Sequence, residues 1–105
     1  MTTYQIRVEY LGTNFVGWQF QKNGLSIQEV LETALSKYLK ENIRVIGSGR
    51  TDSGVHASEQ SAHFKTKNKI NNIGIFLNAV NFFLKKHPVS ILNIQKRSNN
   101  FHARH

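Results

Sequence analysis

The sequence contains no cysteine, a single proline and no long apolar run. Without cysteine the chain can form neither a disulfide framework nor a thiolate site, and this composition fits a reducing cytoplasm. Because its apolar runs are only a few residues long, we expect neither a membrane-spanning helix nor the hydrophobic core of a signal peptide. The 105 residues correspond to one domain, long enough to bury a core without a metal or disulfide.

Acidic residues are missing from the second half of the chain. Residues 1–60 carry six basic and six acidic side chains, whereas residues 61–105 carry eight basic side chains and no acid, which accounts for the net charge of +8. Such one-sided charge favours a polyanionic partner, because each neutralised phosphate releases counterions. The alternative is a basic, asparagine-rich composition that serves only solubility. The eight basic residues are Lys65, Lys67, Lys69, Lys85, Lys86, Lys96, Arg97 and Arg104.

The spacing of apolar residues predicts strands and helices in a defined order. Residues 4–11 alternate between apolar and polar side chains, which is the period of a half-buried strand. Ser26 and Glu29 form a capping box at the start of a helix. Strands are predicted at 4–11, at 43–48, from the turn 49–54 to about 66 and at 89–97, and helices at 27–41 and 73–84. This β-α-β-β-α-β order predicts an α+β, ferredoxin-like domain, in which a four-stranded antiparallel sheet carries both helices on one face.

Asp52 is the only aspartate, and it lies in the turn-rich segment Gly-Arg-Thr-Asp-Ser-Gly-Val-His-Ala, residues 49–57. Asp-Ser-Gly is a favourable turn by itself, so a purely structural role for the carboxylate is one interpretation. Arg50, two residues earlier, indicates a functional role. A guanidinium within about 4 to 6 Å favours the ionised carboxylate, which would keep Asp52 a nucleophile or base.

Residues 49–57 resemble the signature of the TruA-type tRNA pseudouridine synthases, Gly-Arg-Thr-Asp-x-Gly-Val-His-Ala, throughout its length. Residues 10–21 and 26–32 are similar to the family's first loop and first helix, and residues 101–104 to the segment that closes its first half. Leu11 stands where the family commonly has aspartate, and residues 82–90 replace its short turn before the last strand. The resemblance covers nearly the whole chain.

The resemblance implies isomerisation of uridine to pseudouridine in the tRNA anticodon stem-loop, without a metal or redox cofactor. It also implies a cytoplasmic homodimer whose subunits have a second domain. We therefore interpret residues 1–105 as the single N-terminal domain of a longer enzyme, inactive alone. By this resemblance Asp52 is the catalytic nucleophile or base and Arg50 holds it, while Thr51 and His56 shape the loop or contact the flipped nucleotide. The residues expected to contact RNA are Trp18, Thr51, His56, Lys65, Lys67 and Arg104.

Several of these features have a second interpretation. Trp18 is expected either to stack on a base or to pack in the core, and a basic run is often only a solvated surface. The histidines lack the spacing of a metal site. A non-catalytic RNA-binding module of the RRM type shares the element order, but residues 59–65 supply one aromatic side chain where that module needs several. A protein-interaction domain would rest on the fold alone.

Overall fold

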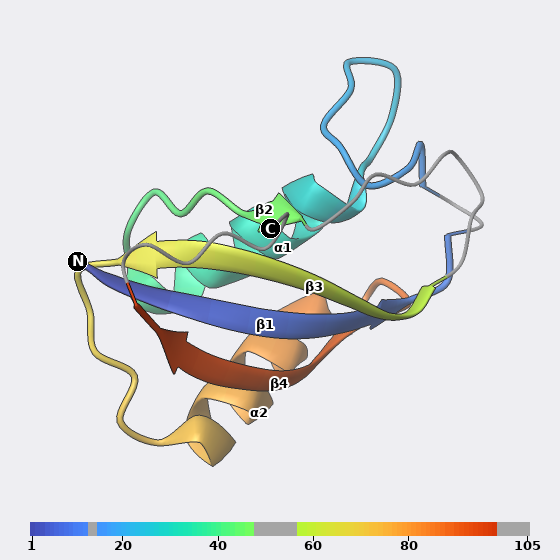
Figure 1. Ribbon diagram of the computed structural model, residues 1–105. Coiled ribbons are helices and arrows are strands. Elements are labelled where there is room, and N and C mark those ends of the chain that lie inside the picture. The colour runs from blue at the N-terminus through green and yellow to red at the C-terminus, as the bar shows by residue number, and fades with distance from the viewer. Residues whose placement is uncertain (13–14, 48–56, 99–105) are drawn as a thin grey trace.

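The computed structural model describes residues 1–12, 15–47 and 57–98 (Figure 1). The four strands form one antiparallel sheet in the order β2-β3-β1-β4. Figure 1 shows both helices on the same side of this sheet, which confirms the predicted α+β, ferredoxin-like architecture. In chain order the elements are β1 Thr2–Tyr10, α1 Ile27–Leu39, β2 Ile46–Gly47, β3 Ala57–Thr66, α2 Ile73–Leu84 and β4 Val89–Arg97. No helix within the described residues is long and apolar enough to cross a membrane.

Strand β1 lies at the centre of the sheet, between β3 and β4, and its alternating sequence explains its position. Ile6 and Val8 are fully buried beneath the helices, whereas Arg7 and Glu9 are exposed on the other face. Successive side chains of a strand point to opposite faces, so one face of β1 builds the core and the other remains polar. Arg7 forms an ion pair there with Glu59 of β3.

Helix α1 begins as the capping box predicts and ends two residues earlier than predicted. The Ser26 hydroxyl accepts a 3.1 Å hydrogen bond from the Glu29 amide. At the other end Lys40 has the left-handed φ of 55°, which stops the helix at Leu39. The Asn68 side-chain amide donates to the Leu39 carbonyl at 2.9 Å, and this bond satisfies a carbonyl that the helix leaves unpaired.

Strand β2 is shorter than the six residues predicted, because side chains of α1 bind the backbone that precedes it. The amide of Ile43 donates to the Ser36 hydroxyl at 2.9 Å, and the amide of Val45 donates to the Glu32 carboxylate at 2.9 Å. These two amides are therefore bonded to the helix and not to β3. Of the described residues 43–47, Ile46–Gly47 alone pairs with β3.

Helix α2 begins and ends where it was predicted and is fixed to β4 by one side chain. The Asn72 side chain caps its first turn, accepting from the Ile75 amide at 2.9 Å. Asn81 both donates to the Ile91 carbonyl, at 3.0 Å, and accepts from the Ile91 amide, at 2.8 Å. This pair of bonds holds α2 against the strand at the irregularity in the β1–β4 register.

Glu41, just beyond α1, connects the end of that helix to the end of β3. Its carboxylate accepts from the Lys67 amide at 3.0 Å, from the Thr66 hydroxyl and from the Asn68 side-chain amide at 2.6 Å. These donors, the Lys67 amide first, lower the pKa of the Glu41 carboxyl from its usual value.

We expect Glu41→Gln to reduce the free energy of unfolding at pH 7 by about 1 kcal/mol, because an amide accepts these hydrogen bonds less well than a carboxylate. A lowered pKa in the folded chain means that the stabilisation is complete above the unfolded value of 4.5 and is lost as the pH falls through the folded value. Urea denaturation between pH 3 and 7 measures this difference. Glu9→Gln, at an exposed site of β1, is the control. An equal loss in both variants, or a difference that does not shrink toward pH 3, would contradict this role.

Candidate functional site

Five of the predicted site residues lie outside the described part of the chain. Arg50, Thr51, Asp52 and His56 fall within residues 48–56, and Arg104 falls within residues 99–105. Their roles stay predictions. The described residues define the framework to which this segment is attached, together with the positions of Trp18, Lys65 and Lys67.

The segment that carries Asp52 connects two strands of the sheet. Gly47, the last residue of β2, lies opposite Ala62 in the middle of β3, whereas Ala57, the first residue of β3, lies opposite Tyr10 at the end of β1. Asp52 is five residues from each of these two attachment points. Covalent geometry therefore keeps it within about 18 Å of both. We call the end of the sheet where β1 ends and where β3 and β4 begin the active end.

Trp18 is buried beneath the end of β2 and packs against it. Its side chain is 2% exposed, and its ring lies 6.1 Å from the ring of Tyr10. A Cβ atom at Gly47 would lie 2.5 Å from Nε1 of Trp18, so the indole packs directly on the backbone of β2. The Tyr10 hydroxyl, next to it, donates to the Gln60 side chain at 2.8 Å. The burial of Trp18 favours core packing over base stacking.

The loop that carries Trp18 is tied to the first turn of α1. The Gly17 carbonyl accepts from the Ile27 amide at 3.1 Å, and the Trp18 carbonyl accepts from the Gln28 amide at 2.8 Å. Amides of a first helical turn have no partner within the helix, so this loop supplies their acceptors. Gly17 has a φ of 111°, a conformation that side chains disfavour, and the chain turns there. The loop and α1 thus form one supported unit beneath β2.

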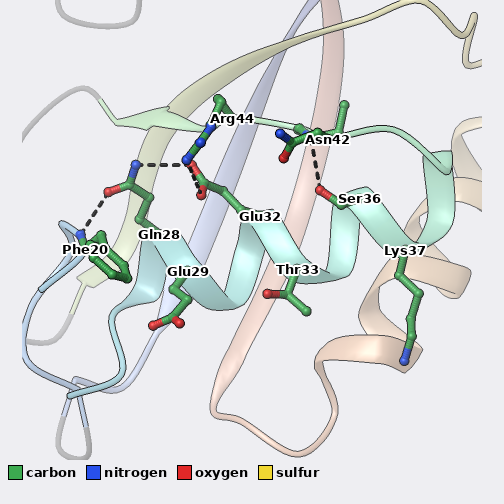
Figure 2. A pocket seen from close by; sticks show the side chains of 10 residues that line it. Phe20, Gln28, Glu29, Glu32, Thr33, Ser36, Lys37, Asn42 and Arg44 are labelled. Carbon is green, nitrogen blue, oxygen red and sulfur yellow. Dashed lines mark hydrogen bonds and ion pairs between the residues drawn. The ribbon is translucent and has the colours of Figure 1, made fainter. Parts of the chain in front are cut away.

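A row of polar side chains on α1 binds the segment that leads into β2, and the apolar periodicity of the sequence does not predict this row. Figure 2 shows Gln28, Glu32 and Ser36 pointing from one face of α1 toward this segment. Besides the bonds from Ile43 and Val45, Gln28 donates to Glu32 at 3.1 Å and accepts from the Phe20 amide at 2.9 Å. The four-residue spacing of the three side chains was the available signal.

A groove of about 670 Å³ runs along this row, with Phe20 at one side. Glu29, Glu32, Lys37 and Arg44 line it, so the groove carries both signs of charge. The Arg44 guanidinium lies 3.8 Å from the Glu32 carboxylate. This mixture makes the groove a poor site for phosphate groups. The Glu32 side chain in this groove binds the Val45 amide and thereby fixes the backbone that leads to Gly47.

Lys65 and Lys67 lie at the opposite end of β3 from the active end. Lys65 is paired with Thr3, near the start of β1, and both lysines are exposed. Eight residues of extended strand separate Ala57 from Lys65, which is roughly 26 Å. Both lysines are therefore far from Ala57, whereas Lys65 is only three residues along β3, roughly 10 Å, from Ala62, the residue opposite Gly47.

No set of three histidine, cysteine, aspartate or glutamate side chains suited to a metal ion occurs among residues 1–12, 15–47 and 57–98. The donors that the described framework offers are amides, hydroxyls and isolated carboxylates.

The fold and this framework define a ferredoxin-like domain in which the segment that contains Arg50 and Asp52 connects Gly47 of β2 to Ala57 of β3. A family model described as tRNA pseudouridine synthase matches residues 6–105. The chain therefore belongs to the tRNA pseudouridine synthase family.

Curated relatives match along nearly the whole chain. The tRNA pseudouridine synthase A of Pelagibacter ubique (strain HTCC1062) is 55% identical over 105 residues, which are 100% of this chain and 43% of that protein. The tRNA pseudouridine synthases A of Ehrlichia ruminantium (strain Gardel) and Ehrlichia canis (strain Jake) are each 45% identical over 102 residues, 96% of this chain and 41% of theirs. The chain thus spans about two fifths of the length of these relatives.

Proposed function

We propose that this chain is the N-terminal part of an enzyme that isomerises uridine to pseudouridine in the anticodon stem-loop of tRNA. The observation that carries the proposal is the nine-residue segment 49–57, complete in its Gly-Arg-Thr-Asp-x-Gly-Val-His-Ala pattern, within a family match that covers residues 6–105. Asp52 is the only aspartate in the chain and lies within this segment, which supports its assignment as the catalytic carboxylate.

The reaction exchanges one bond to the sugar for another. The bond between the sugar carbon C1′ and the uracil nitrogen N1 breaks, the uracil turns, and a bond forms between C1′ and the uracil carbon C5. C5 then releases its hydrogen as a proton, and N1, freed from the sugar, takes up a proton. The product is an isomer of the substrate, so no oxidant or reductant is needed. Asp52 acts as nucleophile or base, and Arg50 favours its ionised form.

The target uridine must leave the base stack to reach Asp52, which costs a few kcal/mol. A catalytic group repays such a cost only when it is held in position, and elements of regular structure hold a site better than free loops do. The attachment of β2 to α1 through Glu32 and Ser36, and of Gly47 to Trp18, supports this role for the framework.

We further propose that the active species is a cytoplasmic homodimer of a longer chain. The relatives are more than twice as long as this sequence, which supports a longer chain. The absence of cysteine fits a reducing compartment.

We expect the complete enzyme to release tritium from uridine labelled at C5 in a tRNA transcript, and residues 1–105 alone to release none. The isolated chain should still bind the transcript weakly, with an affinity that falls as salt rises. Turnover by residues 1–105 would contradict the need for a second domain. Binding without tritium release by the complete enzyme, on all tRNAs of the source organism, would favour the RNA-binding module and overturn the proposed function.

A further inference from the structure

The turn between α2 and β4, residues Lys85–Pro88, lies at the active end of the sheet. The Pro88 carbonyl accepts from the Leu11 amide at 3.0 Å, directly after β1. Val89 is paired with Tyr10, and Tyr10 is paired on its other side with Ala57. Two strand spacings, about 10 Å, therefore separate the start of β4 from the attachment point of the Asp52 segment. In Figure 1 this turn, in orange, lies at the end where β1 ends and β3 begins.

The turn presents two lysines that are not neutralised by an ion pair. Lys85 and Lys86 are exposed, and within the described residues neither forms a salt bridge. The acids near the turn are Glu9 and Glu29, which line small hollows beside His87. The two ammonium groups therefore remain available to an anion.

An aromatic ring orients the first of these lysines. The Lys85 ammonium lies 4.2 Å from the centre of the Phe82 ring, and that ring is 60% exposed. Lys37 lies over Phe83 in the same manner, at 5.2 Å. A cation held over a ring loses less side-chain freedom when it binds than a free lysine does. Exposed aromatic rings interleaved with lysines are also typical of surfaces that bind RNA.

We propose that Lys85 and Lys86 bind backbone phosphates of the substrate RNA beside the uridine that is isomerised. This inference rests on the proposed function, since it requires the substrate to be an RNA held at the active end. The other exposed lysines of the second half lie elsewhere. Lys96 is seven residues along β4 from Val89, roughly 23 Å away, and Lys69 follows the far end of β3. Proximity to Ala57, where the Asp52 segment rejoins the sheet, therefore distinguishes the pair in the turn from Lys69 and Lys96, which carry equal charge.

The test compares two double variants of the complete enzyme that remove the same charge. In Lys85→Ala/Lys86→Ala we expect the Kd for an anticodon stem-loop RNA to rise at least tenfold at 0.1 M salt, measured by fluorescence anisotropy. The slope of log affinity against log salt should fall by about 1.4, the value for two phosphate contacts to single-stranded RNA. In Lys69→Ala/Lys96→Ala we expect a change below threefold. Steady-state kinetics of the first variant should show a raised KM and a kcat within about twofold.

Rescue separates a charge effect from a folding defect. Lys85→Arg/Lys86→Arg keeps both charges, so its Kd should stay within threefold of the wild type. Equal losses in the two alanine variants, or no loss in the variant of the turn, would overturn the inference. Tritium release by the wild-type enzyme is measured in parallel. This assay tests the proposed function separately from the role of the two lysines. An active wild type with an unaffected turn variant refutes only the role of the lysines.

Discussion

Asp52→Asn in the complete enzyme is expected to lower the rate of pseudouridine formation by at least about 10³-fold. Asparagine has nearly the same size and keeps the hydrogen bonds of a turn, but it has no negative charge with which to attack the sugar or base or to accept a proton. The rate is measured as tritium release from C5-labelled tRNA. The Kd for the same tRNA should stay within a few-fold, because the variant removes a catalytic charge and no phosphate contact.

The matched control is Glu59→Gln, which removes a different carboxylate near the start of β3. Glu59 is exposed and pairs with Arg7, so its loss should leave the rate within about twofold. Full activity of Asp52→Asn would refute the assignment of Asp52. A rate loss in Asp52→Asn that is matched by an equal loss of tRNA affinity would instead indicate a structural turn, the other interpretation of Asp-Ser-Gly.

The elements whose sequence has a clear period were predictable, and those whose ends depend on distant partners were not. Alternation along β1 and the three- and four-residue spacing along α2 reflect burial on one face, which the local sequence encodes. The end of α1 depends instead on Lys40 in a left-handed conformation and on Asn68, 29 residues beyond Leu39. No local pattern contains that information.

The length of strand β2 also depends on residues that are distant in sequence. Its apolar residues read as a strand of six, but Glu32 and Ser36 take the amides that would otherwise continue the ladder. The spacing of apolar residues predicts which side chains are buried, but it does not predict which acceptor each backbone amide binds. The one local signal for these helix side chains is the recurrence of polar residues at every fourth position of α1.

The candidate site likewise has one part that the local sequence predicts and another that depends on contacts between distant residues. The motif around Asp52 is contiguous, so nine residues of sequence suffice to recognise it. The framework is assembled from Trp18, Gly47 and Tyr10, which are far apart in sequence and meet only in the fold. Charge alone gave eight equivalent basic residues, and the strand register separates those near the active end from those near the other end.

Gly47→Ala is expected to reduce the free energy of unfolding by about 1 to 3 kcal/mol, the range for overpacking a well-filled site. The added Cβ would lie 2.5 Å from Nε1 and 2.6 Å from Cε2 of Trp18, a rigid ring that is 2% exposed and cannot move into solvent. Urea denaturation of the 105-residue chain measures the loss. In the complete enzyme the same variant should lower kcat, because the segment that carries Asp52 begins at the next residue.

Gly74→Ala is the matched control, with an expected effect of opposite sign. Its Cβ would meet only the Asn72 side chain, at 3.4 Å, and alanine in a helix is favoured over glycine by up to about 1 kcal/mol. A further variant, Trp18→Phe, removes the ring atoms that the new Cβ of Gly47→Ala would meet. We therefore expect Gly47→Ala to cost less in the Trp18→Phe background, with a coupling free energy of about 0.5 to 3 kcal/mol. Strictly additive losses would show that Trp18 and Gly47 are not in contact, and that the indole does not hold the start of the Asp52 segment.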